Sequence, residues 1–198
     1  MGAFLSENPL VLLIGAAEVA FWVFLVAGLA ARYLLRKPRT SAGLLLCVPL
    51  VDLVLIVASL ADVAGGSPPG PVHGLAAVYL GVTVAFGHSL IRWADVRFAH
   101  RFAGGPAPVR PPRGGAARTR REWREFGKLV LAAAIAGVVM LLVTVVAGSP
   151  IPAPSAWLDD PMWSWAARVG MVGAIWFAVG PLWATVFPGR DEEPARAG

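Results

Sequence analysis

Two carboxylates stand in the middle of long apolar runs of this 198-residue chain, Glu18 in the first run and Asp52 in the second. Each lies about nine residues from one end of its run, which places it near the middle of a bilayer at about 1.5 Å per residue. An ionisable group at that depth costs about 2.5–3.5 kcal/mol on insertion scales, so its presence needs a reason. Two facing carboxylates can share a proton or hold a cation, and this chemistry is predicted for Glu18 and Asp52.

His88, in the third apolar run, is the third candidate for binding a proton or a cation. Asp62, His73, Arg92 and Asp95 are predicted to extend a polar path between the two sides of the membrane. The alternative is that these groups only bond between helices or reach water at helix ends. For Arg92 and Asp95, three residues apart, that alternative is a snorkelling pair.

Neither a metal site nor a cofactor is expected. Zinc needs three or four close ligands, and the chain has no H-x-x-x-H or H-E-x-x-H spacing. A haem held by His73 and His88 is the weaker alternative, because these residues are fifteen positions apart on one run and each needs a partner ligand at its own depth. Cys47 is the only cysteine, which excludes two-cysteine redox chemistry.

These residues are carried by five apolar runs, at about 9–35, 43–64, 73–93, 129–148 and 163–187. A helix needs about 20 apolar residues to cross the bilayer, and in lipid every backbone group must be paired internally. The composition agrees, with 57% hydrophobic residues, 15% charged residues and a mean hydropathy of +0.67. The sequence therefore predicts an all-α, polytopic bundle of five transmembrane helices that forms a single membrane domain over residues 1–198.

Small residues predict how these helices pack. Gly74, Ala77, Gly81 and Ala85 fall on one helical face of the third run, which allows a neighbouring helix to approach closely. The first three helices are therefore expected to pack together around Glu18 and Asp52. The fourth and fifth runs carry small-residue stripes of their own, which are expected to serve packing and leave a homo-oligomer open.

Basic residues predict the orientation. Sixteen of the 17 lie at the end of the first run or after it, from the end of the third run to the start of the fourth, or after the fifth, and only Arg168 lies toward the other side. The positive-inside rule then places the N-terminus outside and the C-terminus inside. Trp157, Trp163 and Trp165 are expected to form an aromatic belt at the outer interface.

The segment 94–127 is predicted to be a basic, Gly/Pro-rich cytoplasmic loop. A short helix is expected from Thr119, whose spacing from Glu122 matches a capping box. Arg120, Arg121 and Arg124 are expected to contact anionic lipids of the inner leaflet. This charge sets topology, so we expect no nucleic-acid partner.

The leading functional prediction is a small transport or proton/cation-binding module in a bacterial plasma (inner) membrane, centred on Glu18, Asp52 and His88. One alternative is a non-catalytic assembly or regulatory protein whose polar groups only specify helix packing. The other is an interfacial lipid-modifying enzyme at the inner leaflet, with a phosphate-binding arginine and acid–base groups among His88, Ser89, Arg92, Asp95 and His100. An enzyme is the less favoured class.

Overall fold

The computed structural model describes residues 9–35, 37–109 and 114–189. All regular elements in these ranges are helical. The long helices are α2 (Pro9–Tyr33), α3 (Pro38–Ala64), α4 (Pro71–Phe102) and α5 (Gly115–Val146). A single 3₁₀ turn, η1 (Pro154–Ala156), precedes a last helix that has three parts: α6 (Ser164–Phe177), the π-helical turn η2 (Ala178–Leu182) and α7 (Trp183–Val186).

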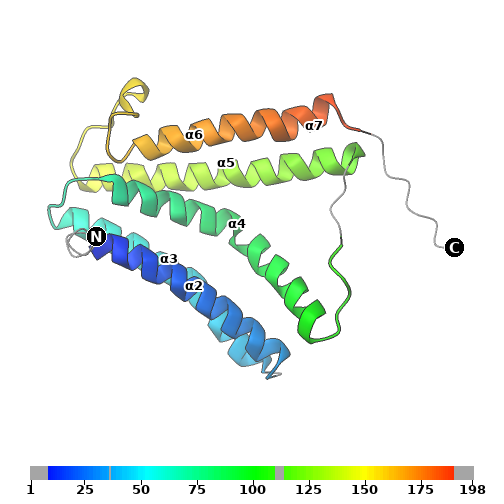
Figure 1. Cartoon of the computed structure of the whole chain (residues 1–198). Coiled ribbons are helices and arrows are strands. Elements are labelled where there is room, and N and C mark those ends of the chain that lie inside the picture. Colours follow the sequence, from blue (N-terminus) through cyan, green and yellow to red (C-terminus); the bar gives the residue numbers. More distant parts are fainter. Residues whose placement is uncertain (1–8, 36, 110–113, 190–198) are drawn as a thin grey trace.

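The helices form two antiparallel pairs joined by α4 (Figure 1). One pair is α2 with α3, and the other is α5 with α6. The first half of α4 lies along α5, and its second half bends away from α5 toward α2. There, Leu25 and Leu29 of α2 are buried in a cluster that includes Leu90 and Phe98 of α4. Because α4 contacts both pairs, it positions the groups of one pair relative to those of the other.

The predicted small-residue face of α4 is used for close packing. Gly74, Ala77, Gly81 and Ala85 are all buried. A β-carbon on Gly81 would overlap the backbone of Ala132 on α5, so only glycine permits this separation of the two helices. Ala132 and Ala136 of α5 are therefore covered by α4 within the same chain, whereas Gly137 of the same helix is open, and a homo-oligomer stays a prediction.

The membrane-spanning character is confirmed, whereas the number of five spans is not. Among the described residues, four segments are long and apolar enough to cross a bilayer, namely Gly15–Tyr33, Pro71–Phe102, Gly115–Val146 and Ser164–Val186. The second predicted span lies within α3, whose apolar part is the shorter segment Leu53–Ala64. A second span thus remains a prediction, although α3 runs beside α2 for much of its length (Figure 1).

The helices extend into the predicted loop 94–127. Helix α4 continues to Phe102 and α5 begins at Gly115, which leaves a much shorter connection. The apolar runs mark only where a helix contacts lipid, and a helix continues into water until a breaker or a capping position ends it. The glycine and proline residues near 104–108 provide that break.

The tryptophans at the start of α6 do not form the predicted interfacial belt. Trp163 is only 5% exposed, and its indole N–H donates to the Thr144 hydroxyl of α5 at 3.3 Å. Trp165 packs against Gly74 of α4. Both rings fill space between helices, since Trp163 also belongs to the buried cluster that contains Met140 and Val143 of α5.

Candidate functional site

Glu18 lines a groove between α2 and α4. The groove has a volume of about 220 Å³, and its walls include the rings of Phe21 and Trp22 from α2 and of Tyr79 and Phe86 from α4. Glu18 lies nine residues after the start of α2, or about 14 Å along the helix, and its mid-membrane depth stays a prediction. We call this feature the Glu18 groove.

The Glu18 carboxylate has no cationic partner within the part of the chain that the structure describes. The indole N–H of Trp22, one turn further along the same helix, donates to Glu18 Oε1 at 3.1 Å. A carboxylate accepts several hydrogen bonds, so capacity remains for a proton, a cation or a donor from a ligand. Aromatic faces beside it add attraction for an organic cation. The groove is therefore suited to a positively charged group with an apolar body.

The predicted pairing of Glu18 with Asp52 stays a prediction. Asp52 lies on α3, and its side chain is outside the part of the chain that the structure describes. Helices α2 and α3 pack together along their length, as at Gly28, where a β-carbon would contact Leu45.

The structure does not bring His88 to the Glu18 groove. The α4 residues that line the groove lie on one side of the helix, and His88 lies on the opposite side at 100° per residue. His88 is exposed, and its Nε2 is 2.7 Å from a guanidinium nitrogen of Arg92. His88 and Arg92 continue the α5-facing stripe beyond the point where α4 diverges from α5, which leaves them exposed.

Asp62, which is half-buried, and His73, which is buried, connect α3 to α4. His73 is 4% exposed, and its Nε2 lies 3.1 Å from Asp62 Oδ2. The Gly70 N–H donates to His73 Nδ1, and the Ser67 hydroxyl donates to Asp62 Oδ1. Because Nδ1 accepts a bond, this pattern assigns the ring proton to Nε2, which donates to Asp62. Both ring nitrogens are engaged, so His73 offers none to a haem iron in this conformation.

Asp95 and Arg92 do not form the predicted snorkelling pair. Asp95 Oδ1 accepts a 3.0 Å hydrogen bond from the Tyr33 hydroxyl of α2 and lies 3.7 Å from the Arg32 guanidinium. Arg92 instead contacts His88 on its own helix. The bend of α4 toward α2 brings Asp95 to Tyr33, and residue spacing within one helix cannot reveal such a contact.

The residues named for the enzyme alternative do not gather at one site in the described structure. Ser89 accepts a 2.7 Å hydrogen bond from Lys128 of α5, whereas Asp95 contacts α2. His100 Nδ1 lies 3.0 Å from the carbonyl oxygen of Gly105, beyond the end of its own helix. Of the five groups named for this alternative, only His88 and Arg92 contact each other, whereas Ser89, Asp95 and His100 have other partners.

Lys128 is a polar residue whose role the sequence analysis missed. Its ammonium donates to Ser89 on α4 and to both carboxylate oxygens of Glu125, at 2.9 and 3.0 Å. The E-x-x-K spacing of Glu125 and Lys128 indicates the ion pair on one helix face, but nothing in the sequence indicates Ser89.

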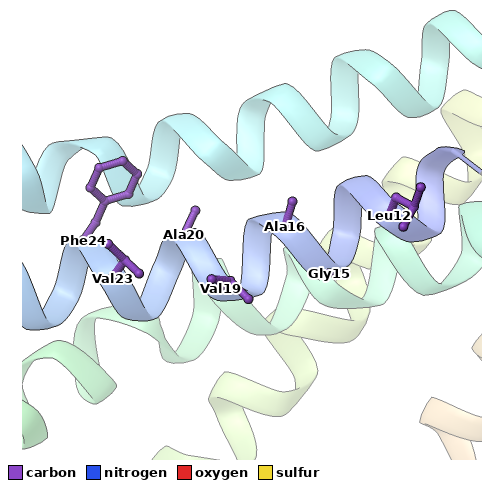
Figure 2. A pocket seen from close by; sticks show the side chains of 7 residues that line it. All are labelled: Leu12, Gly15, Ala16, Val19, Ala20, Val23 and Phe24. Atoms are coloured by element: carbon purple, nitrogen blue, oxygen red, sulfur yellow. The ribbon is translucent and has the colours of Figure 1, made fainter.

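The other side of α2 carries only small and apolar side chains. Leu12, Ala16, Val19 and Val23 are among the residues that line a broad shallow surface there, and Figure 2 shows them along one helix. No polar atom of these side chains can anchor a ligand, so this surface suits contact with lipid chains.

Arrangements of three or more histidine, cysteine, aspartate or glutamate side chains that could hold a metal are absent from the described residues. Arg120, Arg121 and Arg124 are all exposed on the first turns of α5. Nearby, the Thr119 hydroxyl and the Trp123 indole donate to Ala184 and Thr185, so the end of the last helix holds the basic turns in place.

Comparison with known proteins gives one curated relative. The chain is 38% identical over 93 residues to the uncharacterized membrane protein YmcC of Bacillus subtilis (strain 168). The match covers 47% of this chain, and the chain spans about half the length of that relative, 50%. No family model and no solved structure matches. Together with the long apolar helices, this similarity identifies the chain as a multi-pass helical membrane protein.

Proposed function

We propose that this protein binds an amphiphilic organic cation within the membrane, at the Glu18 groove. The observation that supports the proposal is a carboxylate, predicted to lie at mid-depth, with no cationic partner among the described residues, set among aromatic rings from two helices. Glu18 is exposed on the surface of α2, and a carboxylate that faces lipid without a partner is costly, a cost that a bound cation offsets. The groove volume of about 220 Å³ lies below the ~300 Å³ at which drug-sized sites begin, so a single ring with a cationic head is the expected size.

The proposal extends to transport of the bound cation. A groove between two helices at the bundle surface can be entered sideways from the bilayer, and exchange of a proton for the cation on Glu18 would couple the two species. The host membrane is proposed to be a bacterial plasma membrane, in line with the bacterial source of the relative.

Binding is tested with benzyltrimethylammonium and its uncharged carbon isostere, 2,2-dimethylpropylbenzene, added to the purified protein in detergent. The Kd is obtained from the change in tryptophan fluorescence, since Trp22 lines the groove. We expect the cation to bind and the isostere to bind much more weakly. Glu18→Gln should weaken cation binding about tenfold or more, because an interaction with a charged group is worth about 1.5–3 kcal/mol.

Asp159→Asn is the matched control, since Asp159 is an exposed carboxylate in the loop before α6. It should leave the Kd unchanged. Equal binding of the cation by the wild type and Glu18→Gln contradicts the proposal, and so does equal affinity for the two isosteres. Flux of the cation into proteoliposomes tests transport separately, since binding without flux leaves a binding module.

A second function is favoured by the other polar contacts. Asp62 with His73, Ser89 with Lys128, and Tyr33 with Asp95 each join two helices. Most residues of the predicted polar path are therefore engaged in contacts between helices. Such contacts are expected in an assembly or regulatory protein whose polar groups fix one arrangement of helices. Unaltered cation binding in Glu18→Gln would leave this as the favoured function.

A further inference from the structure

A second groove lies between α4, α5 and α6. It is on the opposite side of the exposed Val82 of α4 from the Glu18 groove. Its volume is about 260 Å³, and its walls include Val78 and Val82 of α4, Ala133 of α5 and Val172 of α6. Arg168 of α6 also lines it, and its other lining residues are apolar. We call this feature the Arg168 groove. Val82 also lines the Glu18 groove, so α4 alone separates the two.

The Arg168 guanidinium is held in place without an anionic partner. It lies 5.0 Å from the centroid of the Trp165 ring, which also lines the groove. Asp160, the acidic residue closest along the chain, instead accepts the backbone N–H groups of Met162 and Trp163. No side chain or carbonyl in the described ranges accepts a hydrogen bond from Arg168. Five N–H donors in a planar fork are therefore available, and this geometry matches the oxygens of a phosphate.

The positions of Arg168 and of the apolar walls along α6 match the headgroup and the acyl chain of a phospholipid. Arg168 lies four residues after the start of α6, or about 6 Å into that helix, whereas Val172 lies about 12 Å in. The charge is thus near the membrane surface, and the apolar walls continue toward the bilayer centre. Arginine extends toward the interface from such positions while its stem covers apolar surface.

We infer that the Arg168 groove binds one anionic phospholipid, with its phosphate on the guanidinium and part of an acyl chain against Val78, Ala133 and Val172. Charge complementarity identifies this occupant. A lipid without a phosphate would leave the donors of Arg168 unpaired, and in a zwitterionic lipid the headgroup's own cation competes with Arg168 for the phosphate. In the topology predicted from the arginine distribution, the lipid belongs to the outer leaflet. This site is independent of cation binding at Glu18.

The test is native mass spectrometry of the full-length protein in detergent, titrated with phosphatidylglycerol and, separately, with phosphatidylcholine. We expect one phosphatidylglycerol to bind more tightly than phosphatidylcholine. Arg168→Gln should weaken phosphatidylglycerol binding about tenfold, and Arg168→Lys should restore part of the affinity. Ala133→Phe should fill the groove and displace the chain without changing the charge.

Arg97→Gln is the matched control, because Arg97 also lies over a tryptophan, 4.0 Å from the Trp93 centroid, but does not border the groove. It should leave the tightly bound lipid in place. The inference is overturned if Arg168→Gln binds as the wild type does, or if Arg97→Gln loses the lipid equally. It is also overturned if a folded Ala133→Phe keeps full affinity, if phosphatidylcholine binds as tightly as phosphatidylglycerol, or if soluble glycerol phosphate competes as well as the lipid does.

Discussion

Gly81 of α4 packs directly against the carbonyl group of Ala132 on α5, at a separation that leaves no room for a β-carbon. This contact fixes the separation of α4 and α5, two of the three helices that line the Arg168 groove. Glycine here is a requirement of packing between helices, since its backbone is ordinary helix.

Gly81→Ala is expected to destabilise the protein, because the new methyl group must push α4 away from the α5 backbone. Overpacking of this kind costs about 1–3 kcal/mol. Gly137→Ala on α5 is the matched control, since a β-carbon there meets no atom within 4 Å. It should be neutral or stabilising by up to about 1 kcal/mol through helix propensity. Unfolding in SDS measures both, and equal stability of the two variants would contradict the close contact.

His73→Ala is expected to loosen the connection between α3 and α4. The change removes the hydrogen bonds of the ring to the Gly70 N–H and to the half-buried Asp62, and a lost intramolecular hydrogen bond costs about 1 kcal/mol. His100→Ala removes an exposed histidine from the far end of α4 and should stay within about 0.5 kcal/mol of the wild type. Thermal unfolding in detergent compares the two. A His73 variant as stable as the His100 variant would show that this connection contributes nothing.

Lys128→Met is expected to lower stability by about 1 kcal/mol, because it removes the bond to Ser89 and leaves the Glu125 carboxylate unpaired. The double variant Glu125→Gln/Lys128→Met should recover part of the loss, since no uncompensated charge remains. A double-mutant cycle on unfolding free energies measures the coupling. Strict additivity of the two single changes would mean that the pair does not interact.

The predicted orientation can be read from cysteine labelling. In a Cys47→Ser background, Ser155→Cys in the turn before α6 should react with a membrane-impermeant maleimide in intact cells. Ala107→Cys, in the connection between α4 and α5, should react only after permeabilisation. Both positions are exposed, so accessibility depends on the side of the membrane alone. The parent without an added cysteine controls for background, and the reverse pattern would invert the topology.

The helical, membrane-spanning class could be predicted from the sequence because hydrophobicity and length are local properties. The small face of α4 could be predicted for the same reason, since Gly74 and Gly81 share a side of any regular helix. The mid-depth position predicted for Glu18 also follows from counting residues along α2. Each of these depends on one segment and its distance from the membrane surface, and no knowledge of the neighbouring helices is needed.

The partners of the polar groups were decided only by the tertiary structure. His88 lies on the side of α4 that faces away from the Glu18 groove, and Asp95 contacts Tyr33 because α4 bends toward α2. The packing of α4, α5 and α6 brings Lys128 to Ser89 and Arg168 to Trp165. The rotation of each helix about its axis and the angle at which it crosses its neighbours result from packing many side chains at once, so residue spacing along a single run does not contain them.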